Sequence, residues 1–315
     1  TMDVVAKTLF GADVGRASEQ VGRAMEVVNH FFAKSLAEVI PVPLWLPLPG
    51  NRRFHRAIAQ IDAIVYQMIA EHRSRLDSRR PSDGAGTSGQ HDDAALLTAL
   101  LAARDDAGAA MSDRQLRDEC VTLFLAGHET TALALVHALY WLARRPEICE
   151  RFNQELDSVL GQRQPGWDDV AALDLTGRVI KEAMRLYPPV WSIGREVTEA
   201  FEVAGYRLPV GAQIVASQWV VHRDPRWFPD PETFEPDRWL PERCGQLPRY
   251  AYFPFGLGPR ICIGNHFATT EAILLLAQIG QRFRVEPLSR EPLVFTPSVT
   301  LRPRGDGLRV RLRAR

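Results

Sequence analysis

The stretch Phe255-Gly256-Leu257-Gly258-Pro259-Arg260-Ile261-Cys262-Ile263-Gly264 decides how this sequence is interpreted. Its first two glycines and its proline predict a tight loop that delivers Cys262 to the start of a helix expected over 263–281. Backbone N–H groups and the helix dipole stabilise a thiolate at such a position. Gly264 leaves room for a flat, bulky group to lie close to the backbone.

A single cysteine in this setting suits an axial thiolate ligand of haem iron. The other three cysteines, Cys120, Cys149 and Cys244, are interpreted as inert thiols, because no two cysteines form a C-x-x-C pair. A chain of this length needs no disulfides, so free thiols indicate a reducing compartment and predict a cytoplasmic protein.

The composition is that of a globular chain. Of the 315 residues, 46% are apolar and 24% are charged, which excludes disordered, collagen-like and small disulfide-rich proteins. Thirty-eight basic residues balance thirty-eight acidic ones, so no net field attracts nucleic acid or an anionic membrane. No uninterrupted run of 18 apolar residues occurs, and the sequence predicts neither a membrane segment nor a nucleic-acid partner.

Hydrophobic periodicity predicts a mainly α fold with a small β region. The longest helix is expected over 113–144, where Ser112 and Gln115 form a capping box and the middle is apolar nearly all round. The remaining helices are expected at 2–10, 16–39, 51–78, 94–104, 147–160, 177–187 and 263–281. A β-hairpin is expected at 200–217, further strands at 293–302 and 308–313, and a flexible loop at 79–93.

Three more motifs precede the cysteine loop: Ala126-Gly127-His128-Glu129-Thr130-Thr131, Glu182-Ala183-Met184-Arg185 and Phe234-Glu235-Pro236-Asp237-Arg238-Trp239. Together with F-x-x-G-x-R-x-C-x-G at 255–264, they resemble the motifs of the cytochrome P450 family of haem-thiolate monooxygenases, in that family's order. Any one motif is weak, but four in order are specific. The resemblance covers essentially the whole chain, and it implies one partial P450 catalytic domain over 1–315, mostly helical over 1–190, with the β-hairpin, meander, thiolate loop and last helix over 191–315.

The resemblance implies haem b as the cofactor, with Cys262 as the axial ligand. Arg260 and Arg195 resemble the arginines that hold the haem propionates, a task that suits the guanidinium group; the alternative for each is a solubilising surface charge. The residues implied to contact the cofactor, besides Cys262, are Arg195, Arg260, Phe255, Gly256, Gly264 and Ala126.

The long helix carries the groups implied to act on O2. Ala126 and Gly127 lack bulk, so a ligand could approach the backbone there. Glu129 and Thr130 form the implied catalytic acid–alcohol pair, because cleavage of the O–O bond requires protons. The alternative is a threonine bonded to its own helix beside a solvated glutamate. His128 is not expected to bind metal, because H-E-x-x-H would require a second histidine at 132.

Glu182 and Arg185 are i, i+3 neighbours on one helix face, and Arg238 could complete a buried triad. The alternative is an exposed ion pair of little energetic value. By resemblance, the triad has a structural role and holds the meander and the thiolate loop in place.

The substrate pocket is placed by analogy at Ala126, Val190, Ile193 and Val299, whose apolar side chains predict a hydrophobic organic substrate such as a fatty acid, terpenoid or polyketide. Electrons are expected from a separate donor of the ferredoxin or flavodoxin type with its reductase, since the sequence carries no flavin or nicotinamide fingerprint. Two alternatives stay open: a peroxide-using or isomerase-type haem-thiolate enzyme, and an inactive fragment that does not retain haem. The second arises because the family's early tryptophan–arginine pair has no match ahead of the long helix, which implies a P450 fold lacking its N-terminal helices and first strands.

Overall fold

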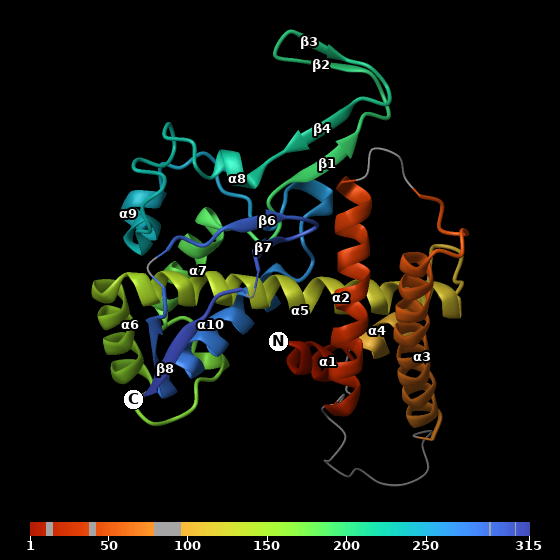
Figure 1. The fold of residues 1–315 in the computed structure, drawn as a ribbon, viewed down its shortest axis with the longest axis horizontal. Coiled ribbons are helices and arrows are strands. Elements are labelled where there is room, and N and C mark those ends of the chain that lie inside the picture. The colour runs from red at the N-terminus through yellow and green to blue at the C-terminus, as the bar shows by residue number, and fades with distance from the viewer. Residues whose placement is uncertain (11–14, 38–41, 79–95, 290, 306) are drawn as a thin grey trace. The chain divides into compact units, whose positions relative to one another are not determined.

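The computed structural model describes residues 1–10, 15–37, 42–78, 96–289, 291–305 and 307–315 (Figure 1). The loop predicted at 79–93 lies outside these residues. The chain divides into two compact units, Thr1–Glu129 and Thr130–Arg315. The boundary falls within a single helix, α5 (Asp113–Arg144).

The first unit is helical. It contains α1 (Met2–Phe10), α2 (Gly15–Ala37), α3 (Pro49–Ser78), α4 (Leu96–Ala102) and the beginning of α5. Its core forms where the apolar stripe of α3, including Ile61, Val65 and Ile69, packs against buried side chains of α2 such as Met25. The predicted helices are therefore present, with ends displaced by a few residues.

Helix α5 begins at the predicted capping box. The Ser112 N–H donates to Gln115 Oε1 at 2.9 Å, and the Gln115 N–H donates to Ser112 Oγ at 3.3 Å. Within the described part of the chain, α5 is the one helix long and apolar enough to cross a membrane. A core helix has the same length and composition, so this property alone does not show a membrane segment.

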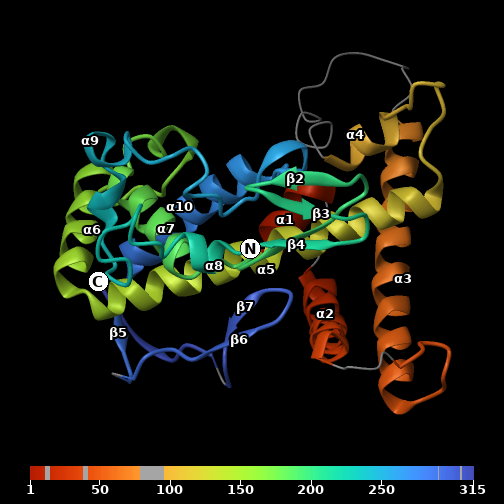
Figure 2. The ribbon, with the colours of Figure 1, turned by 90° about the horizontal axis from the view of Figure 1, so that it is seen from above.

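The second unit packs α6 (Pro146–Val159), α7 (Asp174–Leu186) and α10 (Asn265–Arg282) around the C-terminal half of α5 (Figures 1 and 2). A Cβ at Gly280 of α10 would lie 2.4 Å from Phe152 Cε1 of α6, so only glycine permits this close approach. Shorter helices join these elements: α8 (Gln218–Val221), α9 (Pro241–Cys244) and the 3₁₀ turns η1 (Trp167–Asp169), η2 (Pro236–Trp239) and η3 (Gly258–Arg260).

The strands described in the second unit form four antiparallel pairs. They are β1 (Ile193–Glu196) with β4 (Gln213–Ala216), β2 (Phe201–Val203) with β3 (Tyr206–Leu208), β5 (Phe283–Pro287) with β8 (Val310–Ala314), and β6 (Phe295–Pro297) with β7 (Leu301–Pro303). The fold is mainly α with a small β region, as predicted.

The predicted hairpin is wrong in its extent, and one strand was not predicted. The hairpin expected over 200–217 is confined to β2 and β3, because positive φ angles at Ala204 and Gly205 close a two-residue turn, and β4 pairs instead with β1. The segments 293–302 and 308–313 both contain strands, as predicted, but these strands do not pair with each other. The first folds on itself as β6–β7, and the second pairs with β5, which follows α10 without a breaker and was not predicted as a strand.

Candidate active site

Cys262 lies in a loop that its own backbone closes. The Cys262 N–H donates to Phe255 O at 2.9 Å, and the Ile261 N–H donates to Gly258 O at 3.0 Å. Gly256 and Gly258 have φ angles of 77° and 69°, which side-chain-bearing residues rarely adopt. The loop therefore depends on both glycines, and it presents an exposed thiol three residues before α10 begins.

The surroundings of this thiol fit a haem group. Ile261, Ile263 and Phe267 are 49%, 89% and 37% exposed, so apolar side chains flank the thiol with little protein covering them. A Cβ at Gly264 would lie 4.0 Å from Cys262 Sγ, and glycine keeps that side of the sulfur open. No group of three or more His, Cys, Asp or Glu side chains among the described residues is placed to hold a metal ion. A single thiolate beside an apolar surface is the donor set that haem iron takes in haem-thiolate proteins.

The other cysteines have a different environment. Burial raises the pKa of the Cys120 thiol to about 12 and also raises that of Cys149. Both therefore stay protonated near neutral pH, where a thiol is a poor ligand. Cys244 Sγ donates to Trp239 O at 3.6 Å.

The two candidate propionate arginines carry accessible guanidinium groups. Arg260 ends η3 and makes no hydrogen bond or ion pair with the residues the structure describes. Arg195 lies on β1, is exposed, and donates to the neighbouring Gly194 O at 2.7 Å. Each guanidinium therefore retains donors for an anionic group.

The structure brings Glu182, Arg185 and Arg238 together. Arg185 Nε and Nη2 donate to the two carboxylate oxygens of Glu182, both at 2.9 Å, and Arg238 Nε donates to Glu182 Oε1 at 3.4 Å. Glu182 and Arg185 are fully buried and Arg238 is 5% exposed. An exposed ion pair, the alternative considered from the sequence, does not describe this arrangement.

A chain of hydrogen bonds runs from this triad toward the thiolate loop. Arg185 Nη1 donates to His222 O at 2.9 Å and to Pro231 O at 2.7 Å. His222 Nε2 accepts from the Phe253 N–H at 2.9 Å, two residues before Phe255. Burial, with the nearby positive charge of Arg185, lowers the pKa of His222 to about 3, so the imidazole stays neutral and able to accept.

His222 was not identified from the sequence. A lone histidine in a Pro- and aromatic-rich stretch carries no pattern of its own, and its partners lie 31 and 37 residues away.

Glu129 and Thr130 occupy consecutive positions on α5. Glu129 Oε2 accepts from Asn29 Nδ2 of α2 at 2.8 Å, a contact between residues 100 positions apart that the sequence did not predict. His128 Nδ1 lies 3.2 Å from Phe124 O of its own helix. An amide therefore orients the candidate acid.

Glu271 is a second buried acid that the sequence analysis missed. It lies on α10 and is 5% exposed. Burial raises its pKa to about 7, and the nearby Thr131 side chain, which follows Thr130, opposes this shift. The only sequence signal was one carboxylate at the edge of the apolar run Ala272-Ile273-Leu274-Leu275-Leu276.

Three of the four candidate substrate residues lie on adjoining segments of the second unit. Trp191 Nε1 donates to Ser298 O at 2.8 Å, and the Leu301 N–H donates to Pro189 O at 2.8 Å. These bonds join the segment containing Val190 and Ile193 to the turn containing Val299. Val190 and Ile193 are half-buried, and Val299 is exposed. Ala126, also exposed, belongs to the first unit.

Comparison with known proteins identifies the family. Residues 1–310 match the family described as Cytochrome P450. The chain is 39% identical over 306 residues to cyclooctatin synthase of Streptomyces melanosporofaciens, which covers 96% of this chain and 62% of that protein. It is 39% identical over 284 residues to pentalenene oxygenase of Streptomyces avermitilis, which covers 89% of this chain and 60% of that protein. The crystal structure of the cytochrome P450DA heme domain matches with a TM-score of 0.83 at 28% identity, covering 100% of this chain and 66% of that one.

The chain belongs to the cytochrome P450 family, and its fold is the P450 fold that the four motifs predicted. It spans about three fifths of the length of the curated relatives it matches.

Proposed function

We propose that this chain is part of a haem-thiolate monooxygenase that inserts one oxygen atom of O2 into a hydrophobic organic substrate. One observation carries the proposal: in a member of the P450 family, an exposed thiol sits on a loop fixed by two left-handed glycines and hydrogen-bonded back to a buried triad. A mere packing cysteine would need none of these features.

Bound haem would supply the redox chemistry that activates O2. The protein would hold it through Cys262 Sγ, with the Cys262 N–H fixed on Phe255 O so that the sulfur keeps one direction. Arg260 and Arg195 would each donate charge-assisted hydrogen bonds to a propionate carboxylate. The apolar side chains of Ile261 and Ile263 would be covered by the macrocycle.

Glu129 and Thr130 would manage the protons that O–O cleavage consumes. The Asn29 amide holds Glu129 Oε2 and so orients the carboxyl group that would exchange protons. The hydroxyl of Thr130, the next residue on the helix, would donate its proton in the reaction and would regain a proton from Glu129. Water exclusion around α5 would prevent protons from reaching the site by other routes.

The substrate proposed is an unsaturated terpenoid. The names pentalenene oxygenase and cyclooctat-9-en-7-ol 5-monooxygenase denote an alkene and an unsaturated alcohol as the compounds those relatives act on. Val190, Ile193, Val299 and Ala126 would offer such a molecule apolar contacts without hydrogen bonds. Electrons would come from a separate ferredoxin or flavodoxin with its reductase, in a cytoplasm that keeps the four cysteines free.

The test is isotopic. The haem-loaded protein is incubated with pentalenene, a ferredoxin, its reductase and a reduced nicotinamide under labelled dioxygen. One labelled oxygen atom per product molecule is expected, with the second appearing in water. A product that carries no label, or that forms only when hydrogen peroxide is added, would contradict the proposal.

A further inference from the structure

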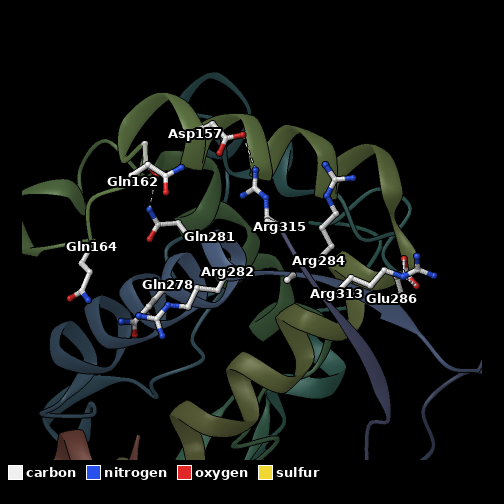
Figure 3. Close-up of a pocket in the computed structure, with 12 residues that line it drawn as sticks. Asp157, Gln162, Gln164, Gln278, Gln281, Arg282, Arg284, Glu286, Arg313 and Arg315 are labelled. Atoms are coloured by element: carbon white, nitrogen blue, oxygen red, sulfur yellow. Dashed lines mark hydrogen bonds and ion pairs between the residues drawn. The ribbon is translucent and has the colours of Figure 1, made fainter.

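A cavity of about 830 Å³ in the second unit is unsuited to the proposed hydrophobic substrate (Figure 3). It lies between the end of α6, the end of α10 and the strand pair β5–β8, and its lining includes Gln281, Arg282 and Arg284. Figure 3 also shows Arg315 reaching to Asp157, and these two groups form an ion pair of 2.7 Å. A polar and charged lining excludes a hydrocarbon, so the apolar segments of this unit remain the place where such a substrate would bind.

Two hydrogen bonds join the segment that follows α7 to the turn between β6 and β7. The Leu301 N–H donates to Pro189 O, and Trp191 Nε1 donates to Ser298 O, both at 2.8 Å. The first bond joins two backbone groups and does not depend on a side chain. The second depends on the identity of one residue, because an indole carries an N–H donor and a phenyl ring carries none.

These two bonds bracket two residues of the proposed substrate pocket. Val190 lies between the two bonded residues of its segment, and Val299 lies between the two bonded residues of the turn. Val190 is half-buried, and Val299 is 52% exposed. Because each valine stands between tethered residues, the bonds fix the spacing of the two apolar walls.

The backbone of Trp191 is itself anchored to a third segment. Trp191 O accepts from Ser217 Oγ at 3.1 Å and from the Trp219 N–H at 3.2 Å. Ser217 is the N-cap of α8, and its Oγ accepts from the Val220 N–H at 3.4 Å. Since both the backbone and the indole of Trp191 are bonded, this residue ties the turn to a fixed support.

Strand β6 has a separate anchor that does not involve the Trp191 indole. The Phe295 ring lies 4.4 Å from the Tyr187 ring and 6.3 Å from the Trp219 ring, measured between centroids. Loss of the Trp191 N–H would therefore leave β6 in place and loosen only the turn that follows it.

We propose that Trp191 is a positioning residue, whose indole N–H holds the turn carrying Val299 against the segment carrying Val190 and so sets the width of the substrate pocket. The inference rests on the proposed function for the place of that pocket. A pocket with fixed walls discriminates between molecules that differ by a few carbon atoms, whereas a wall left loose adapts to both.

The first measurement tests the bond itself. Trp191→Phe keeps an aromatic ring and removes the donor, and Trp227→Phe is the matched control, because Trp227 is 39% exposed and the partner of its ring is the Arg226 guanidinium. Amide hydrogen exchange of the peptide 293–303 is followed by mass spectrometry. Exchange in Trp191→Phe should be about two- to tenfold faster than in the wild type, the factor that one hydrogen bond contributes, and unchanged in Trp227→Phe.

The second measurement tests the width of the pocket. Azole nitrogen binds ferric haem iron whatever the natural substrate is, so imidazole and 4-phenylimidazole are titrated into the haem-loaded protein and followed by the shift of the Soret band. The ratio of their dissociation constants should change by at least about twofold in Trp191→Phe and stay constant in Trp227→Phe.

Unchanged exchange in Trp191→Phe would overturn the proposal. So would faster exchange with an unchanged ratio of dissociation constants, because the bond would then hold the turn without shaping the pocket. Neither measurement requires turnover, so a protein that oxidises no terpenoid would contradict the proposed function without affecting this test.

Discussion

Substitution of Glu182 tests whether the buried triad holds this fold together. The Glu182 carboxylate accepts five hydrogen bonds: two from Arg185, one from Arg238, one from Trp239 Nε1 at 2.9 Å and one from the Glu235 N–H at 3.0 Å. Glu182→Ala leaves two buried guanidinium groups without their shared anion, which costs about 3–5 kcal/mol. Two neutral donors also lose their acceptor, at about 1–3 kcal/mol each.

The summed cost is comparable to the whole stability of a typical domain, about 5–15 kcal/mol. Glu182→Ala is therefore expected to yield little folded protein. Glu182→Gln keeps the shape and one acceptor oxygen but loses the charge, and it should remain measurable with a loss of about 3 kcal/mol. The matched control is Asp174→Ala on the same helix, which breaks the ion pair of Asp174 with Arg178, where the Asp174 side chain is 65% exposed; its cost should stay below about 1 kcal/mol.

The assay is urea unfolding of the three variants and the wild type, followed by far-ultraviolet circular dichroism and tryptophan fluorescence. The free energy of unfolding should be highest for the wild type, lower for Asp174→Ala, lower again for Glu182→Gln, and lowest for Glu182→Ala. A Glu182→Gln variant as stable as Asp174→Ala would refute the claim that the triad is an energetic lock.

Three further predictions concern single side chains. Thr130→Ala should keep haem binding but divert electrons to peroxide, which is measured as a lower ratio of product formed to oxygen consumed. The control Thr122→Ala, on the exposed part of the same helix, should leave this ratio unchanged. Equal ratios in the two variants would show that Thr130 does not deliver protons. Burial lowers the pKa of His137 to about 4 from 6.5, so the stability that neutral His137 contributes is complete above pH 6.5 and is lost as pH falls toward 4. In urea unfolding, the difference in unfolding free energy between the wild type and His137→Asn should therefore narrow by about 2 kcal/mol from pH 7.5 to pH 5, and a difference that does not change with pH would contradict this account. His222→Leu removes the acceptor of the buried Phe253 N–H, so it should lower the free energy of unfolding by about 1–3 kcal/mol and reduce haem occupancy. A haem occupancy equal to that of the control His30→Leu would show that His222 does not position the thiolate loop.

The four motifs were sufficient to predict the fold, because their occurrence together in one order is specific although each motif alone is weak. The helices followed from apolar spacing, since a buried stripe such as Ile61, Val65 and Ile69 is visible in the sequence itself. Strand pairing was less predictable. The partner of β8 is β5, which precedes it by about 25 residues, and alternation along a strand indicates a buried face but not which strand covers its edge.

The contacts of the candidate site were likewise only partly predictable from the sequence. The contact of Glu182 with Arg185 is an i, i+3 relation that any helix provides, so it could be predicted. Its complete burial, and the approach of Asn29 to Glu129 and of His222 to Phe253, depend on how distant segments pack.

The carbon monoxide spectrum of the reduced, haem-loaded protein tests the central claim most directly. With Cys262 as the thiolate ligand, the wild type should show the long-wavelength Soret band characteristic of haem-thiolate proteins. Cys262→Ser should lose that band, while Cys244→Ser, which alters a thiol bonded to a backbone carbonyl, should retain it. An unchanged spectrum in Cys262→Ser would contradict the assignment of the thiolate, and with it the proposed chemistry of this chain.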